Sequence, residues 1–191
     1  ESLQFGCVSV TNRFFADGII TEKALKKAQR AVATELQELQ TVFRNTGWQT
    51  AVGSSGTIRS AATMCEVNGW CRSGITYQGL ESLKQKALSF NTIQAISIGG
   101  LSDDRKPVFI GGLAVMLACF ETLGIDAMVV SQFALREGLL QDQLGRLERR
   151  DPRDKAVKAL ISRFAVDASQ VKRVRRTALN LFNQLSLDSG L

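Results

Sequence analysis

Apolar and polar positions alternate along this chain with two periods, one typical of strands and one typical of helices. Short, dense apolar runs predict strands at about 3–10, 48–52 and 125–130. Stretches with apolar residues three or four positions apart predict helices at about 21–44, 57–66, 76–88 and 105–123. Because strands and helices follow one another in turn, the pattern favours an α/β fold around a central sheet.

Capping and turn residues mark the ends of several of these elements. Thr21 carries a hydroxyl suited to cap the N-terminus of the first long helix, and Gly47 ends that helix. Pro107 fits the first turn of the very apolar helix that follows it, and Gly124 closes that helix. The segment 94–101 alternates too little to be assigned to either class.

The last forty residues have a different character. From Asp151-Pro152 onward the chain predicts two charged helices, at about 152–164 and 167–186, each with one apolar stripe. Such stripes need a surface to pack against. The composition therefore predicts two parts, an α/β domain over 1–150 and a helical segment over 151–191.

A glycine-rich loop follows the predicted strand at 48–52 and opens a helix. Gly53 and Gly56 would allow positive φ and a close approach of a ligand, and three hydroxyls stand among them, those of Ser54, Ser55 and Thr57. A helix N-terminus with free N–H groups favours phosphate. The competing interpretation is a tight turn in which Thr57 or Ser55 caps the helix.

A second loop of the same type lies at 131–138, after the apolar run 127–130 and before another helix. In open α/β sheets, ligands bind outside the carboxyl ends of the strands. The two loops are therefore expected to border one cleft.

Cysteine and histidine usage limits the chemistry. The chain has four cysteines and no histidine, and the cysteines have no metal-ligand spacing. Without histidine, Ser-His-Asp and Cys-His catalysis within this chain is excluded. Cys65 and Cys71 could form a bridge if oxidised, whereas reduced thiols are the expectation in a cytosolic protein.

The charge balance suits an anionic partner without identifying it. With 24 basic and 18 acidic residues the net charge is +6. The densest basic cluster is Lys172, Arg173, Arg175 and Arg176, which spans more than one helix face and has no aromatic residues interleaved for base stacking. This favours a solvated helix or a path for an anionic polymer over sequence-specific binding of nucleic acid.

No membrane span is predicted, so no membrane partner is expected.

Several motifs together resemble those of the exopolyphosphatase and guanosine pentaphosphate phosphohydrolase (Ppx/GppA) family. In order, they are Gly6–Ser9, Gly47-Trp48, Gly53–Thr57, Leu101–Arg105, Gly112–Leu117, Ala134–Gly138 and Asp151–Asp154. The resemblance covers nearly the whole chain. It implies an incomplete actin-like (ribonuclease H-like) lobe, the second of the family's two lobes, with the start of a helical C-terminal extension.

The resemblance also implies a function. Family members release terminal phosphate from inorganic polyphosphate, guanosine pentaphosphate or both, by metal-assisted attack of water, with a divalent cation that we expect to be Mg²⁺. The complete protein is expected to be a cytoplasmic homodimer. Sugar kinases of the same superfamily fit less well, because the Ala134–Gly138 loop is not their pattern.

Two arginines stand at motif positions by resemblance. Arg105 and Arg136 are expected to bind phosphate oxygens, since a guanidinium can do so in a bidentate way, with Glu137 and Gly138 in support. Alternatively, Arg105 caps a helix or pairs with a neighbouring aspartate, and Arg136 with Glu137 ties a helix start to a loop.

The catalytic glutamate and the first phosphate loops of the family would lie upstream of Glu1. The general base is therefore unassigned, no metal ligand is named, and the chain is expected to be an inactive fragment of the enzyme. The alternative is a non-catalytic module that binds polyanions. The choice between polyphosphate and guanosine pentaphosphate stays open.

Overall fold

The computed structural model describes residues 3–147, 157, 161, 163 and 167–189. The chain divides into two compact units, Glu1–Ala134 and Leu135–Leu191. The predicted boundary at Asp151-Pro152 lies outside the described residues.

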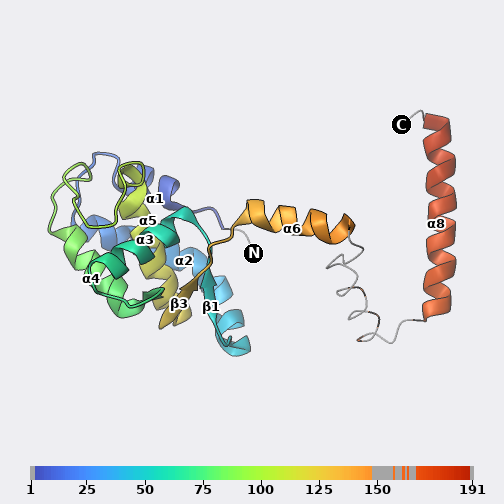
Figure 1. Ribbon diagram of the computed structural model, residues 1–191, viewed down its shortest axis with the longest axis horizontal. Coiled ribbons are helices and arrows are strands. Elements are labelled where there is room, and N and C mark those ends of the chain that lie inside the picture. Colours follow the sequence, from blue (N-terminus) through green and yellow to red (C-terminus); the bar gives the residue numbers. More distant parts are fainter. Residues whose placement is uncertain (1–2, 148–156, 158–160, 162, 164–166, 190–191) are drawn as a thin grey trace. The chain divides into compact units, whose positions relative to one another are not determined.

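The first unit is rich in helices, and one helix lies at its centre. Its elements are α1 (Cys7–Phe14), α2 (Glu22–Thr46), β1 (Ala51–Gly53), α3 (Gly56–Val67), β2 (Ile75–Thr76), α4 (Tyr77–Leu88), α5 (Lys106–Leu123) and β3 (Ala127–Val130). Helix α5 contacts α1, α2, α3 and α4 (Figure 1). Ten of its residues are buried, so the core of this unit is built around it.

By length and composition alone, α5 could cross a membrane. Of this segment, 56% is buried inside the unit, as for the core helix of a globular domain. Its sequence explains the ends: Pro107 stands in the first turn, where a missing N–H costs nothing, and Gly124 adopts a left-handed conformation at φ 76°.

Helix α2 confirms the predicted helix at 21–44. The Thr21 hydroxyl accepts a hydrogen bond from the N–H of Ala24 at 3.1 Å, and Gly47 ends the helix with φ 69°. Apolar residues at helical spacing face the core, among them Leu25, Ala28, Val32 and Leu36.

The predicted strand at 3–10 is wrong, because this segment forms α1. Gly6 caps the helix together with Ser9, whose hydroxyl accepts from the N–H of Gly6 at 2.9 Å. Val10 and Thr11 are buried, and the helix packs on α5. A short apolar run does not distinguish a strand from a buried helix, and here the close approach to α5 favours the helix.

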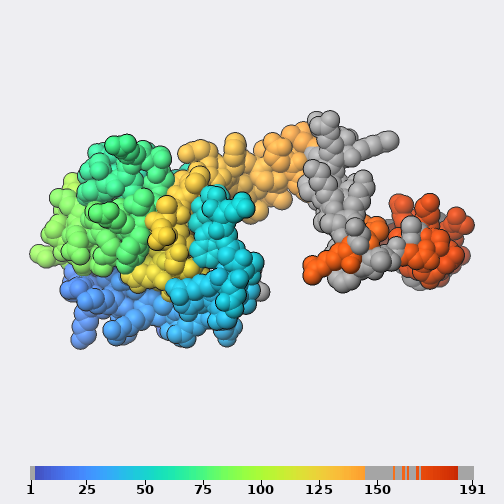
Figure 2. Space-filling view, turned by 90° about the horizontal axis from the view of Figure 1, so that it is seen from below, coloured from blue at the N-terminus to red at the C-terminus, as the bar shows by residue number. Residues whose placement is uncertain are grey.

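The three strands form a small sheet in the order β1-β3-β2. Strands β1 and β3 are parallel, with Val52 opposite Val129, and β2 is antiparallel to β3. Figure 2 shows the surface of β3 directly beside that of β1. One face of the sheet packs on the core through Ala51, Met128 and Val130. On the other face, Val52 and Val129 are 62% and 57% exposed.

The segment 94–101 forms neither a helix nor a strand. Ile96 and Ile98 are nevertheless buried, so this loop closes one side of the core. Its last glycine, Gly100, has a positive φ of 87° and lies against the backbone of α3.

The described part of the second unit contains α6 (Leu135–Leu147) and α8 (Ala168–Ser189). Helix α8 confirms the predicted helix at 167–186, and Asp167 caps it by accepting from the N–H of Ser169 at 2.7 Å. Most of the predicted helix 152–164 lies outside the described residues. The basic cluster of α8, Lys172, Arg173, Arg175 and Arg176, is exposed.

Candidate phosphate-binding site

The two predicted loops start side by side at one edge of the sheet. Parallel pairing of β1 and β3 places Gly53 opposite Val130, so both strands end at the same place. The N–H of Ser131 donates to the carbonyl of Gly53 at 2.8 Å and holds the two chain ends together. This is the edge at which open α/β sheets bind ligands.

The first loop leads directly into α3. Ser55 is the N-cap of this helix, and its hydroxyl accepts from the N–H of Ile58 at 3.1 Å. The capping role that the sequence left open thus belongs to Ser55. Gly56 and Thr57 follow in the first turn, where N–H groups have no acceptor within the helix and point along its axis. Ser54 is exposed at the tip of the loop.

The two glycines of this loop allow neighbouring side chains to pack directly against the backbone. The positive φ that glycine permits is not used here, since neither Gly53 nor Gly56 is among the positive-φ glycines of the described residues. A Cβ on Gly53 would overlap the side chains of Met128 and Ile58. A Cβ on Gly56 would stand 2.6 Å from Nη1 of Arg105. The group that approaches Gly56 closely is therefore a guanidinium of the same chain.

Arg105 thus lies against the first loop, residues 53–57, although it is distant from that loop in the sequence. Its guanidinium lies on the first residue of α3, and its Nε is 3.3 Å from Oδ2 of Asp104. The side chain is 43% exposed, so solvent and ligands can reach it. A hydrogen bond with Ser102 and the charge of Arg105 lower the pKa of the Asp104 carboxyl, which keeps this partner ionised. The alternative pairing of Arg105 with a neighbouring aspartate thus occurs, and its contact with phosphate stays a prediction.

Thr57 anchors the loop in the core. Its methyl group lies against Gly112 of α5, where a Cβ would overlap it. Two contacts therefore hold the start of α3: Thr57 packs on Gly112, and the Arg105 guanidinium packs on Gly56.

The second loop divides between the two units. Ser131 and Phe133 belong to the first unit, and the Ser131 hydroxyl accepts from the N–H of Phe133 at 3.1 Å. Arg136, Glu137 and Gly138 lie in the first turn of α6 in the second unit. Arg136 is exposed there. Their role at the site stays a prediction.

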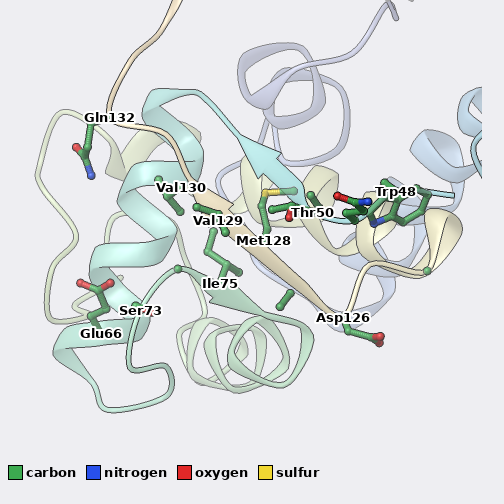
Figure 3. Close-up of a pocket in the computed structure, with 15 residues that line it drawn as sticks. Trp48, Thr50, Glu66, Ser73, Ile75, Asp126, Met128, Val129, Val130 and Gln132 are labelled. Carbon is green, nitrogen blue, oxygen red and sulfur yellow. The ribbon is translucent and has the colours of Figure 1, made fainter.

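A cavity of about 700 Å³ lies along the small sheet (Figure 3). It is lined by 15 residues from 48–51, 66, 73–75, 124, 126–130 and 132. None of the five loop residues 53–57 and neither predicted arginine is among them. This cavity was not predicted from the sequence. Its lining includes Trp48, a large aromatic residue that is 41% exposed.

Metal ligands do not gather in the described residues. Within them, no group of three or more His, Cys, Asp or Glu side chains could hold a metal ion. The divalent cation that the resemblance implies stays a prediction.

Comparison with known proteins identifies the family. The Ppx/GppA phosphatase family matches residues 1–147. A guanosine-5'-triphosphate,3'-diphosphate pyrophosphatase of Aeromonas hydrophila is 37% identical over 97% of this chain, and one of Pseudoalteromonas translucida is 33% identical over 97%. The chain spans 37% of the length of each of these relatives.

Solved structures agree with this assignment. A crystal structure of the Aquifex aeolicus member of the Ppx/GppA family matches 76% of this chain and 48% of its own, with a TM-score of 0.64 and 25% identity. An exopolyphosphatase of Cytophaga hutchinsonii, at 19% identity and a TM-score of 0.61, shares the fold. The first unit is thus an incomplete actin-like α/β domain, as predicted. The chain belongs to the Ppx/GppA phosphatase family.

Proposed function

We propose that this chain supplies one wall of the phosphate-binding site of a phosphohydrolase that releases terminal phosphate from inorganic polyphosphate or guanosine pentaphosphate. The observation that carries the proposal is the Arg105 guanidinium, which lies on the first residue of α3 at the carboxyl edge of the sheet. The names of the relatives support the substrate class.

The described residues would bind and orient the phosphate chain. N–H groups of Gly56 and Thr57, with the exposed Ser54 hydroxyl, would donate to phosphoryl oxygens, and the Nη groups of Arg105 would neutralise their charge. Water then attacks the terminal phosphorus and the bridging P–O bond breaks. The shortened phosphate chain departs with the bridging oxygen, and the terminal phosphoryl group with the oxygen of water becomes orthophosphate. Among the described residues, none is assigned as the base that takes the proton of this water. The complete protein would act as a cytoplasmic homodimer.

The second candidate is a module that binds polyanions without catalysis. The exposed basic residues of α8, together with the net charge of +6, favour this alternative. It predicts binding that depends on charge alone, whereas a built phosphate site predicts preference for polyphosphate over other polymers of equal charge.

Calorimetry with defined-length polyphosphate separates these candidates. We expect this chain to bind polyphosphate at low salt, to bind it more weakly at moderate salt because charges are screened, and to prefer it over single-stranded RNA of matched charge. Equal affinity for the two polymers would support the non-catalytic module. No binding at low salt would contradict both.

Substitution of Ser55 separates capping from phosphate binding. Aspartate is as good an N-cap as serine, so Ser55→Asp should keep the free energy of unfolding within about 0.5 kcal/mol, while Ser55→Ala should lower it by about 1 kcal/mol. The added carboxylate should repel phosphate and weaken polyphosphate binding roughly tenfold.

Thr21→Asp is the matched control, because Thr21 caps α2 in the same way and lies outside the loop. This variant should leave polyphosphate affinity unchanged. Equal loss of affinity in Ser55→Asp and Thr21→Asp would show that only net charge matters, and would contradict a phosphate site at the start of α3.

A further inference from the structure

Two thiols of the first unit lie close together beside the sheet cavity. Cys65 stands in the last turn of α3, and Cys71 in the turn that leads to β2. The N–H of Cys71 donates to the carbonyl of Cys65 at 3.2 Å. With standard backbone dimensions, this bond keeps the two Cα atoms within about 7 Å, the upper limit for a disulfide.

The sulfur atoms themselves meet at a glycine of α4. A Cβ placed on Gly79 would overlap Sγ of Cys71 and stand 3.5 Å from Sγ of Cys65. Sγ of Cys71 therefore occupies the space that a side chain at position 79 would take, and Sγ of Cys65 lies at van der Waals distance from the same point. Sγ of Cys71 also lies 3.3 Å from the Thr76 hydroxyl, which fixes its direction. Both cysteines are free thiols.

We propose that Cys65 and Cys71 are a reversible modification site, which a low-molecular-weight disulfide such as glutathione disulfide converts into an intramolecular disulfide. Cys71 is partly exposed and reacts first, whereas Cys65 is fully buried. The Cys71 thiolate attacks one sulfur of glutathione disulfide and releases a glutathione thiolate. The Cys65 thiolate then attacks Sγ of Cys71 and releases the second glutathione.

The exchange balances without any other oxidant. Two protein thiols are oxidised to one disulfide, and glutathione disulfide is reduced to two glutathione thiols, which take up the two protons. Excess reduced glutathione reverses both steps.

Burial of Cys65 sets the pH dependence of the second step. Desolvation, with the nearby Cys71, raises the pKa of the Cys65 thiol to about 12. Far below that pKa the thiolate fraction rises about tenfold per pH unit, so the closing step should accelerate accordingly between pH 7 and 9.

The bridge would hold one wall of the cavity. Glu66 follows Cys65 in α3, Ser73 lies two residues after Cys71, and both line the cavity (Figure 3). Oxidation would tie the turn that carries Ser73 to the helix that carries Glu66. The modification therefore acts beside the cavity, at the end of α3 opposite the phosphate loop.

Intact-mass spectrometry of a two-cysteine chain tests the proposal. Cys7→Ser with Cys119→Ala leaves only the proposed pair. After treatment of the folded protein with glutathione disulfide, we expect a mass loss of about 2 Da and a bridged peptide containing both cysteines, reversed by reduced glutathione. In the same background, Cys65→Ala should stop at a glutathione adduct on Cys71, and Cys71→Ser should form no disulfide.

The complementary chain is the matched control. Cys65→Ala with Cys71→Ser retains only Cys7 and Cys119 and should show no mass loss under the same conditions. The proposal is overturned if the folded two-cysteine chain stays reduced or stops at the glutathione adduct. It is also overturned if the bridge forms only after unfolding in urea.

Discussion

Gly111→Ala is expected to lower the free energy of unfolding of the first unit by about 3 kcal/mol, because α1 and α5 meet there backbone to backbone. A Cβ on Gly111 would stand 2.6 Å from both the carbonyl oxygen of Cys7 and the amide nitrogen of Thr11. Those atoms belong to the backbone of α1 and cannot rotate away. The helices would have to separate, which would open the contact between α1 and α5 in the core. Urea unfolding followed by circular dichroism measures the change.

Gly138→Ala is the matched control for this substitution. Gly138 also lies within a helix, but no atom outside its own helix backbone lies within 4 Å of a Cβ placed there. Alanine favours helix by up to about 1 kcal/mol over glycine, so this variant should be neutral or slightly stabilising. A Gly111→Ala protein as stable as the parent would show that α1 does not pack on α5 in this way.

Periodicity predicted the elements whose apolar residues are many and regularly spaced. Helices α2 and α5 were predicted nearly to their ends, because each has a long apolar face and a recognisable cap, Thr21 for α2 and Gly124 for α5. Segment 3–10 was predicted wrongly, because seven or eight residues contain too few turns to distinguish the two periods. Its helical state depends on the partner, since α1 fits only where α5 has no side chain at Gly111.

The loop residues of the site were predictable for a similar reason. A strand end, small residues and a helix start follow one another in the sequence at 51–57, and the structure forms β1, a capped turn and α3 there. Arg105 was singled out only by resemblance, and its contact with Gly56 was not predicted, because contacts between Arg105 and the loop depend on tertiary packing. The cavity was missed, since its lining comes from several short segments with no common pattern.

Helix α5 connects the core with the site. The backbone of α1 packs against Gly111. The methyl group of Thr57 packs against the next residue of α5, Gly112. Arg105 is the N-cap residue of this same helix. The position of the loop at 53–57 is therefore set by the helix at the centre of the core, and a rigid support of this kind gives a candidate site precise geometry.

Arg105→Ala is expected to lower kcat/KM for phosphate release about 100-fold in the complete enzyme that contains this chain. The guanidinium can donate two parallel N–H groups to phosphoryl oxygens. Its positive charge stabilises the transition state, in which negative charge develops on the departing phosphate chain. Arg105→Lys should recover only part of the loss, since an ammonium lacks the planar fork. Orthophosphate release from polyphosphate and from guanosine pentaphosphate measures the effect, and the larger loss identifies the substrate that depends on this arginine.

Lys106→Ala is the matched control, because Lys106 is the next residue and also pairs with an aspartate, Asp103, at 3.2 Å. Both ion pairs are partly or fully exposed, so neither substitution should change the free energy of unfolding by more than about 1 kcal/mol. A loss of activity confined to Arg105→Ala would thus come from phosphate binding. If Arg105→Ala keeps kcat/KM within about threefold of the parent while Arg136→Ala does not, the phosphate contact belongs to the second loop, and Arg105 only packs on Gly56.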